Sequence, residues 1–221
     1  GVADLFTLAA TIPTMDYNND GNPDFDGSKI AFVSQSLGSI TGIQFLALED
    51  TVNTAVLSVP GGGIARMLDG SPTFGPTIRD GLAAAGVIAG TPDYDQFMVV
   101  TQTVIDSGDP LNFGAITTAT NNVLLHEVID EIVIPNSVPG APLSGTDPLI
   151  AEMGLPLISS TTANADGVDA AVRFTAGDHG SLLSPAASLA ATVEMQTQMA
   201  SMVGSMGTAV VVTDTTVVEG Q

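Results

Sequence analysis

The sequence predicts an α/β fold in which a mostly parallel sheet is flanked by helices. Short, continuous runs of apolar residues recur along the chain, and such runs are typical of strands that are covered on both faces. Longer segments with the helical spacing of apolar residues lie between them, so strands and helices alternate. With 221 residues, of which 44% are hydrophobic, the chain can build one sizeable core.

The first half of the chain is expected to begin with a helix that ends before Pro13, a residue that cannot continue it. A polar loop then leads into two apolar strands that are separated by a helix. The Gly-rich segment after the second strand is read as a turn. The expected elements, in chain order, are a helix over residues 3–12, a strand over 29–33, a helix over 37–48, a strand over 54–59 and helices over 77–85 and 94–105.

The second half repeats the alternation more loosely. A third apolar run, NVLLHEVI, is followed by a long segment without clear periodicity and then by a fourth run, AAVRFT. A long helical pattern and the short run AVVV close the chain. The expected elements are strands over 122–129 and 170–175, a helix over 186–203 and a final strand over 209–212.

Charge and composition exclude several classes of function. The net charge is −20 with only four Lys and Arg residues, so a phosphate backbone would be repelled and nucleic-acid binding is excluded. Cysteine is absent, which excludes disulfides, thiol catalysis and cysteine metal sites. No apolar run approaches the ~20 residues of a membrane span. Such an acidic surface is compatible with a salty or calcium-containing medium.

A serine lies at the junction between the first strand and the helix that follows it. The local sequence Ser34-Gln35-Ser36-Leu37-Gly38 places small residues two before and two after Ser36. This is close to the Gly-x-Ser-x-Gly elbow, in which a strained turn exposes a serine hydroxyl, with Ser34 in place of the first glycine. A polar strand-to-helix loop without chemistry is the alternative. Ser36 is therefore a candidate nucleophile.

Acidic and histidine side chains follow two later strands. Asp130 and Glu131 come after the third strand and His179 after the fourth, and ligands gather at the carboxyl ends of parallel strands. The chain order serine, acid, histidine is that of α/β-hydrolases. A histidine base would activate Ser36, and an acid would orient the histidine. His126, the other histidine, lies inside the third strand, where a structural role is expected.

The loop DYNNDGNPDFDG, residues 16–27, resembles the start of an EF-hand calcium loop. A glycine occupies the sharp turn at position 6, but Gly27 stands where the bidentate glutamate would be. Asx turns without a metal are the alternative, since these residue types favour turns anyway. A bound Ca²⁺ is expected to be structural. Its expected ligands are Asp16, Asn18, Asp20, Asn22, Asp24 and Asp26.

Four segments together resemble a bacterial extracellular lipase family, the VolA-like surface lipases and lysophospholipases of the α/β-hydrolase fold. They are DFDGSKIAFVSQSLGSITG, LLHEVIDEIVIPNSVPGAPLSGTDPL, DHGSLL and ATVEMQTQMA, and the resemblance runs from about residue 15 to the C-terminus. It implies a secreted or surface-located ester hydrolase acting on lipids, with Ser36 as nucleophile and His179 as general base. Counting back four residues from Pro135, as is common in this fold, favours Glu131 over Asp130 as the acid.

The resemblance also implies that part of the catalytic domain is missing. In this fold the nucleophile follows the fifth strand, whereas here it follows the first, so residues 1–221 correspond to the C-terminal part of a single domain. The Leu37 N–H is the expected first oxyanion donor, and the second would come from the missing part. We therefore expect the N-terminal portion of the same lipase as a bound companion chain, with Gly1 as an internal start.

The sequence does not determine which ester is the substrate. The leading expectation is a lipid or acyl ester whose acyl group enters a pocket lined by residues 64–88 and Phe113. A lysophospholipid or a synthetic polyester is possible with the same chemistry, and a peptidase is not excluded by the triad. The alternative from another class is a non-catalytic, calcium-stabilised adhesion or assembly module on a degenerate hydrolase fold.

Overall fold

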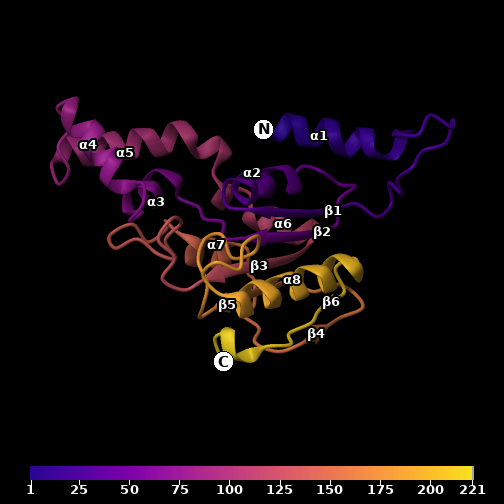
Figure 1. The fold of residues 1–221 in the computed structure, drawn as a ribbon. Coiled ribbons are helices and arrows are strands. Elements are labelled where there is room, and N and C mark those ends of the chain that lie inside the picture. Colours follow the sequence, from indigo (N-terminus) through magenta and orange to yellow (C-terminus); the bar gives the residue numbers. More distant parts are fainter. Residues whose placement is uncertain (221) are drawn as a thin grey trace.

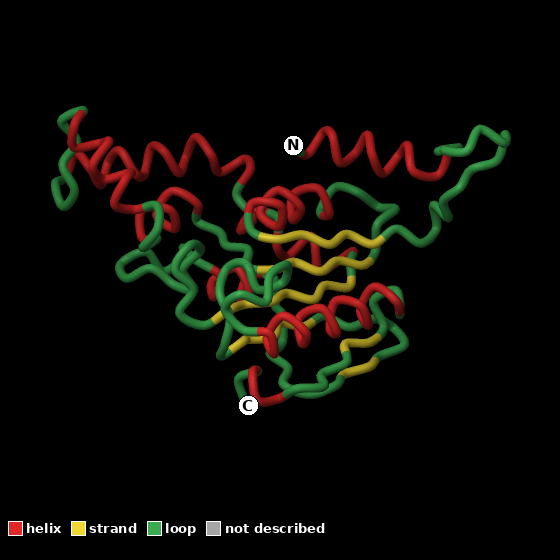
Figure 2. The backbone as a smooth tube through the Cα atoms, in the orientation of Figure 1, coloured by secondary structure: helices red, strands yellow, loops and turns green. Residues whose placement is uncertain are grey.

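In the computed structural model, which describes residues 1–220, a four-stranded parallel sheet forms the centre of the molecule (Figures 1 and 2). Its strands lie side by side in the order β1-β2-β3-β5. Every neighbouring pair is parallel, as the continuous apolar runs predicted. The strands are β1 (Ala31–Gln35), β2 (Thr54–Ser58), β3 (Asn122–Val128) and β5 (Ala170–Phe174).

Helices cover both faces of this sheet. Helices α2 (Leu37–Leu46), α6 (Gly114–Thr120) and α7 (Thr146–Glu152) lie on one face with α1 (Val2–Thr11) packed on α2, and α8 (Leu189–Gly204) covers the other face. Side chains that alternate along β2 separate accordingly: Leu57 joins the core beneath α2, whereas Val56 joins the core beneath α8. The remaining helices are α3 (Ile64–Gly70), α4 (Gly75–Ala84) and α5 (Pro92–Ile105).

The α/β class and the four central strands are confirmed, while the last predicted strand is corrected. Residues 209–212 do not join the parallel sheet. Instead β6 (Ala209–Val210) pairs antiparallel with β4 (Thr162–Ala163) in a separate two-stranded ribbon. The run AVVV is apolar enough for a central strand. However, the chain reaches it directly from α8, on the outer side of the helix layer.

Short elements were missed in the segments that lack clear periodicity. Helices α3, α6 and α7 have seven residues each, which is two turns, and such short helices give little periodic signal. Helices α4 and α5 form an arm that extends away from the sheet (Figure 1). Among residues 1–220, no helix is long and apolar enough to cross a membrane.

Strand β1 is an edge strand of the described sheet. It pairs with β2 on one side only, and Val33 on it is 43% exposed. The strand also lies two residues later than the predicted run, so that it ends at Gln35, directly before Ser36. On the covered face Phe32 packs so tightly against α2 that a side chain at Gly42 would overlap its ring. Helix α2 is thereby fixed against the strand that carries the elbow.

Candidate active site

Ser36 occupies a sharp turn between β1 and α2. Its backbone has φ 55° and ψ −124°, a conformation that non-glycine residues rarely adopt. The Ser36 N–H donates to the Ser58 carbonyl on β2 at 2.9 Å, which anchors the turn to the sheet. A Cβ built on Gly38 would lie 3.6 Å from the Ser34 Cβ, in ordinary van der Waals contact, so helix and strand lie close together at these two positions. This is the local geometry of a nucleophile elbow.

Leu37 is the first residue of α2, so its N–H has no acceptor within the helix. The N-terminus of a helix carries partial positive charge, which favours an anionic oxygen close to it. The Leu37 N–H thus lies where an oxyanion donor is needed, next to the Ser36 hydroxyl. Its role as the first donor stays a prediction.

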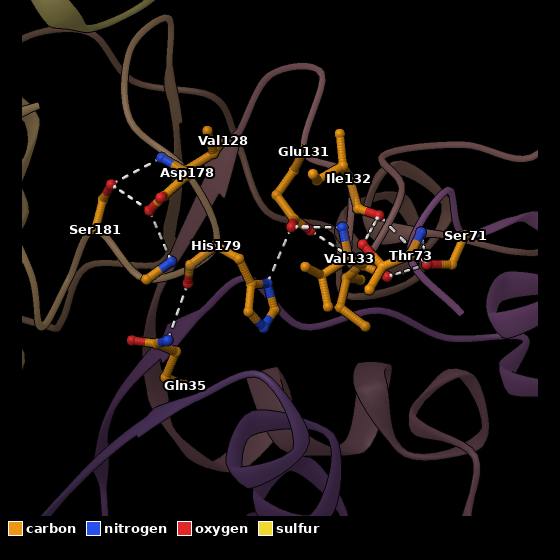
Figure 3. Close-up of polar contacts among 12 residues, drawn as sticks. Gln35, Ser71, Thr73, Val128, Glu131, Ile132, Val133, Asp178, His179 and Ser181 are labelled. Carbon is orange, nitrogen blue, oxygen red and sulfur yellow. Dashed lines mark hydrogen bonds and ion pairs between the residues drawn. The ribbon is translucent and has the colours of Figure 1, made fainter. Parts of the chain in front are cut away.

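The loops after β3 and β5 bring Glu131 and His179 together (Figure 3). His179 Nδ1 lies 3.1 Å from Glu131 Oε1, which is hydrogen-bond distance, although the N–H direction is not well aligned with it. The Glu131 carboxylate is buried and accepts from the backbone N–H groups of Val133, at 2.7 Å, and Ile134, at 2.5 Å. These two bonds fix the carboxylate, so it can orient the imidazole.

Asp130 lies outside this arrangement. Its side chain is exposed, and its backbone adopts φ 59° where β3 turns into the loop. The Asn136 side chain closes that loop by accepting from the Asp130 N–H and donating to the Val128 carbonyl, both at 2.9 Å. Of the two acids that the sequence left open, the geometry therefore brings Glu131 to the histidine and not Asp130.

Ser36 lies at an apolar pocket of about 370 Å³. Its walls come from α2, α3, α4 and the Glu131 loop, and none of the residues that line it is charged. Phe113, expected here, packs instead in the core beneath α2, and Ile88 is exposed beyond the pocket. The lining residues are Ser36, Leu37, Ile40, Ile64, Met67, Leu68, Phe74, Thr77, Ile78 and Ile134.

Two hydroxyl residues that were not predicted from the sequence connect the pocket wall by hydrogen bonds to the loop that carries Glu131 (Figure 3). Ser71 Oγ donates to the Val133 carbonyl at 2.7 Å, and Thr73 Oγ1 donates to the Ile132 carbonyl at 2.9 Å. Both lie in the turn between α3 and α4. The segment SPT would be read as an ordinary turn, so the sequence holds no signal for this contact.

An ion cluster joins β3 to β5 beneath the two loops. The Arg173 guanidinium on β5 donates to the buried Glu127 carboxylate on β3 at 2.6 Å and also contacts Asp147 and Glu219. Burial, with Asp147 adding to it, raises the pKa of Glu127 to about 7 although Arg173 acts in the opposite direction. The cluster holds together the strand ends that carry Glu131 and His179.

His126 is a core residue, as expected. The ring is fully buried on β3, packs edge-on against Phe174 with ring centroids 5.4 Å apart, and neither ring nitrogen has a well-formed hydrogen bond among the described residues. Burial lowers its pKa to about 4, and the adjacent Gln198 side chain offsets only part of this effect. His126 is thus neutral in the folded state at neutral pH.

The buried histidine predicts an acid-sensitive stability. Because the folded-state pKa of His126 is about 4 and the unfolded value is 6.5, the unfolded chain binds more protons between these pH values. Folding stability should therefore be present above pH 6.5 and be lost as the pH falls towards 4, by up to ~3 kcal/mol from this group. His126→Asn should flatten that loss in urea unfolding at pH 7 and pH 4.5. The same curves for His179→Asn serve as control, and equal slopes in the two variants would contradict the assignment.

The loop between α1 and β1 is organised by Asx turns. The Asp16 carboxylate accepts from the N–H groups of Asp20, at 3.1 Å, and Gly21, at 2.8 Å, and Asp24 accepts from the Tyr17 N–H at 2.5 Å. Asn18 donates to the Asp24 carboxylate and Asn22 donates to the Asp20 carboxylate, whereas Asp26 faces Ser28 and Lys29. Within residues 1–220, no group of three acidic or histidine side chains is arranged to hold a metal ion.

Calcium binding at this loop stays a prediction, based on its sequence spacing. Bound Ca²⁺ would stabilise the folded state by mass action, so we expect the melting temperature to rise with calcium concentration and to fall with EDTA. The double variant Asp16→Ala, Asp20→Ala should lose this response, and Asp93→Ala with Asp95→Ala on α5 is a control of equal charge change. A melting temperature that changes with neither calcium nor EDTA would contradict calcium binding and support Asx turns without a metal.

Comparison with known proteins identifies the fold. A puromycin hydrolase crystal structure superposes with a TM-score of 0.51 at 16% identity, covering 92% of this chain and 25% of that chain. A puromycin-hydrolysing peptidase of Mycobacterium tuberculosis gives 0.57 at 14% identity, covering 95% and 27%. Both have the α/β-hydrolase fold, so the chain has this fold, and it spans about a quarter of the length of these structures. No protein-family model and no curated protein sequence matches it.

Proposed function

We propose that this chain carries the nucleophile, acid and base of a serine hydrolase that cleaves acyl esters through an acyl-enzyme. The observation that carries the proposal is the position of Ser36, on a strained elbow at the mouth of an apolar pocket. The contact between His179 and Glu131 supplies an oriented base. Ser36 and the imidazole are not joined by a hydrogen bond among the described residues, but such contacts commonly tighten only when substrate binds.

The mechanism follows from these positions. His179 takes the Ser36 proton as Ser36 Oγ attacks the ester carbonyl, and Glu131 stabilises the imidazolium that results. The Leu37 N–H donates to the developing oxyanion. The alcohol leaves with the proton from His179, and water then attacks the acyl-enzyme with His179 as base. A second oxyanion donor comes from outside residues 1–221.

The pocket favours a neutral acyl chain over an aminoacyl group. The chain shares its fold with puromycin hydrolases, but a shared fold alone does not determine which substrate is cleaved. A substrate ammonium that enters an apolar pocket loses hydration without gaining an anionic partner, since no acidic residue lines this one. A volume of about 370 Å³ lies at the lower end of ligand pockets. We therefore propose a lipase or esterase activity, and expect the protein in the secreted or surface-located fraction.

Substrate preference tests this assignment. We expect p-nitrophenyl octanoate to be cleaved with a higher kcat/KM than an aminoacyl p-nitroanilide. Ile78→Trp, at the half-buried pocket wall, should lower kcat/KM for octanoate about tenfold or more and leave p-nitrophenyl acetate little changed. Ile116→Trp, at an exposed position on α6 outside the pocket, is the matched control. A preference for the anilide would favour a peptidase. If Ile78→Trp lost activity towards both the octanoate and the acetate ester while Ile116→Trp kept both, the pocket would not be the site that selects the acyl chain.

The free side of β1 supports the proposed companion segment. An exposed edge strand is an aggregation hazard unless something covers it, and β1, with the apolar residues Ala31, Phe32 and Val33, is also bordered by an apolar groove of about 290 Å³ beneath α1. An N-terminal portion of the same protein could supply both a pairing strand and the second oxyanion donor, which is worth roughly 10²–10³ in kcat. We expect denaturing gels and intact mass spectrometry of active material to reveal this portion. An active, monodisperse species of this chain alone would contradict the proposal.

A further inference from the structure

The end of β1 is connected directly to the loop that carries His179. Gln35, the last residue of the strand, precedes Ser36 in the chain, and its Nε2 donates to the His179 backbone carbonyl at 2.9 Å (Figure 3). The two residues are 144 positions apart in the sequence. One side chain therefore links the residue beside the candidate nucleophile to the backbone of the candidate base.

His179 is held at two points. Its ring contacts Glu131 at 3.1 Å and its carbonyl accepts from Gln35, so both ends of the residue have a fixed partner. The turn around it is closed by its own hydrogen bonds, because Ser181 Oγ accepts from the Asp178 N–H and donates to the Asp178 carboxylate. A turn that is rigid in itself still needs a contact that sets its distance from Ser36.

The side-chain amide of Gln35 makes a hydrogen bond through its nitrogen but not through its oxygen. Its Oε1 is buried and has no hydrogen-bond partner among the described residues. A buried acceptor without a partner is unfavourable, and such groups call for a structural or functional reason. The donated bond to His179 is the contact that this side chain does make.

From this geometry we propose that Gln35 is a positioning residue, which sets the His179 imidazole at its working distance from Ser36. The proposal rests on the proposed serine hydrolase function. Gln35 is not among the residues that line the pocket at Ser36, and it contacts the base through the His179 backbone carbonyl. Because misplacement of a catalytic group by about 1 Å can cost 10²-fold in rate, loss of this link should affect kcat and not substrate binding.

Gln35→Met keeps the length of the side chain and removes its donor. The variant is tested in the form of the protein that shows hydrolase activity. We expect kcat for p-nitrophenyl octanoate to fall about 10²-fold with KM unchanged, and the rate of Ser36 labelling by a fluorophosphonate to fall by the same factor. Gln44→Met is the matched control, since Gln44 on α2 likewise donates from Nε2 to a distant backbone carbonyl, that of Ser107, at 3.1 Å. Its kcat and labelling rate should equal those of the unchanged protein.

A second variant covers the case in which Gln35→Met does not fold. Gln35→Ala removes the same donor without adding bulk or charge, so once its melting temperature shows that it is folded, kcat and labelling should fall as in Gln35→Met. Labelling and kcat equal to the unchanged protein in either folded variant would overturn the positioning role alone. Failure of the unchanged protein to be labelled at Ser36 would overturn the proposed function, and the positioning role with it.

Discussion

Ser36→Ala is expected to abolish the hydrolysis of p-nitrophenyl esters, with kcat falling on the order of 10⁴–10⁶-fold. Loss of a serine nucleophile in a triad has effects of this size, because the remaining groups contribute only binding and oxyanion stabilisation. The elbow geometry at Ser36 is the reason for choosing this serine. The measurement is kcat at saturating ester, with folding checked by melting temperature.

Ser34→Ala is the control for that result. Ser34 lies two residues earlier, and its hydroxyl is 2.9 Å from the buried Ser39 hydroxyl, which itself donates to the Ser58 carbonyl. Its loss should cost stability, about 1 kcal/mol, and leave most of the activity. Loss of activity in Ser34→Ala together with an active Ser36→Ala would mean that the elbow has been misassigned.

His179→Ala is expected to lower kcat by a similar factor, on the order of 10⁴–10⁶. The structure gives His179 a buried, doubly hydrogen-bonded carboxylate beside Nδ1, which suits an imidazole that must accept and return a proton. Steady-state kinetics at constant pH would measure the effect. An active His179→Ala enzyme would end the triad interpretation.

The acid partner can be tested by a pair of adjacent substitutions. Glu131→Gln should lower kcat on the order of 10⁴-fold, as loss of the orienting acid does in other triads. Asp130→Asn removes the same charge one residue earlier, on an exposed side chain, and should leave kcat nearly unchanged. The reverse ranking of these two variants would make Asp130 the acid.

The sequence predicted the α/β class, the four parallel strands and the elbow because their signals are local. Continuous apolar runs mark strands that are covered on both faces, and the small residues around Ser36 mark a tight strand-to-helix turn. The final strand was misplaced because an apolar run does not say which layer it joins. The helices α6 and α7 were missed because two turns give too few periodic positions.

The site was predictable only in part, since some of its contacts depend on tertiary structure. Two adjacent acids, Asp130 and Glu131, are equivalent by order along the chain, and only the turn at Asp130 buries one and exposes the other. The contact from Gln35 to His179 spans 144 residues and has no local signal. The same holds for Ser71 and Thr73, whose carbonyl partners lie about 60 positions away.

Fluorophosphonate labelling followed by peptide mass spectrometry would show whether Ser36 is an activated nucleophile, because the probe reacts with an activated serine whatever the natural substrate. We expect a single modified peptide that carries the adduct on Ser36, with labelling absent from Ser36→Ala and strongly reduced in His179→Ala. An unlabelled protein would support a non-catalytic module on a hydrolase fold. An adduct on another serine would contradict the active site described above.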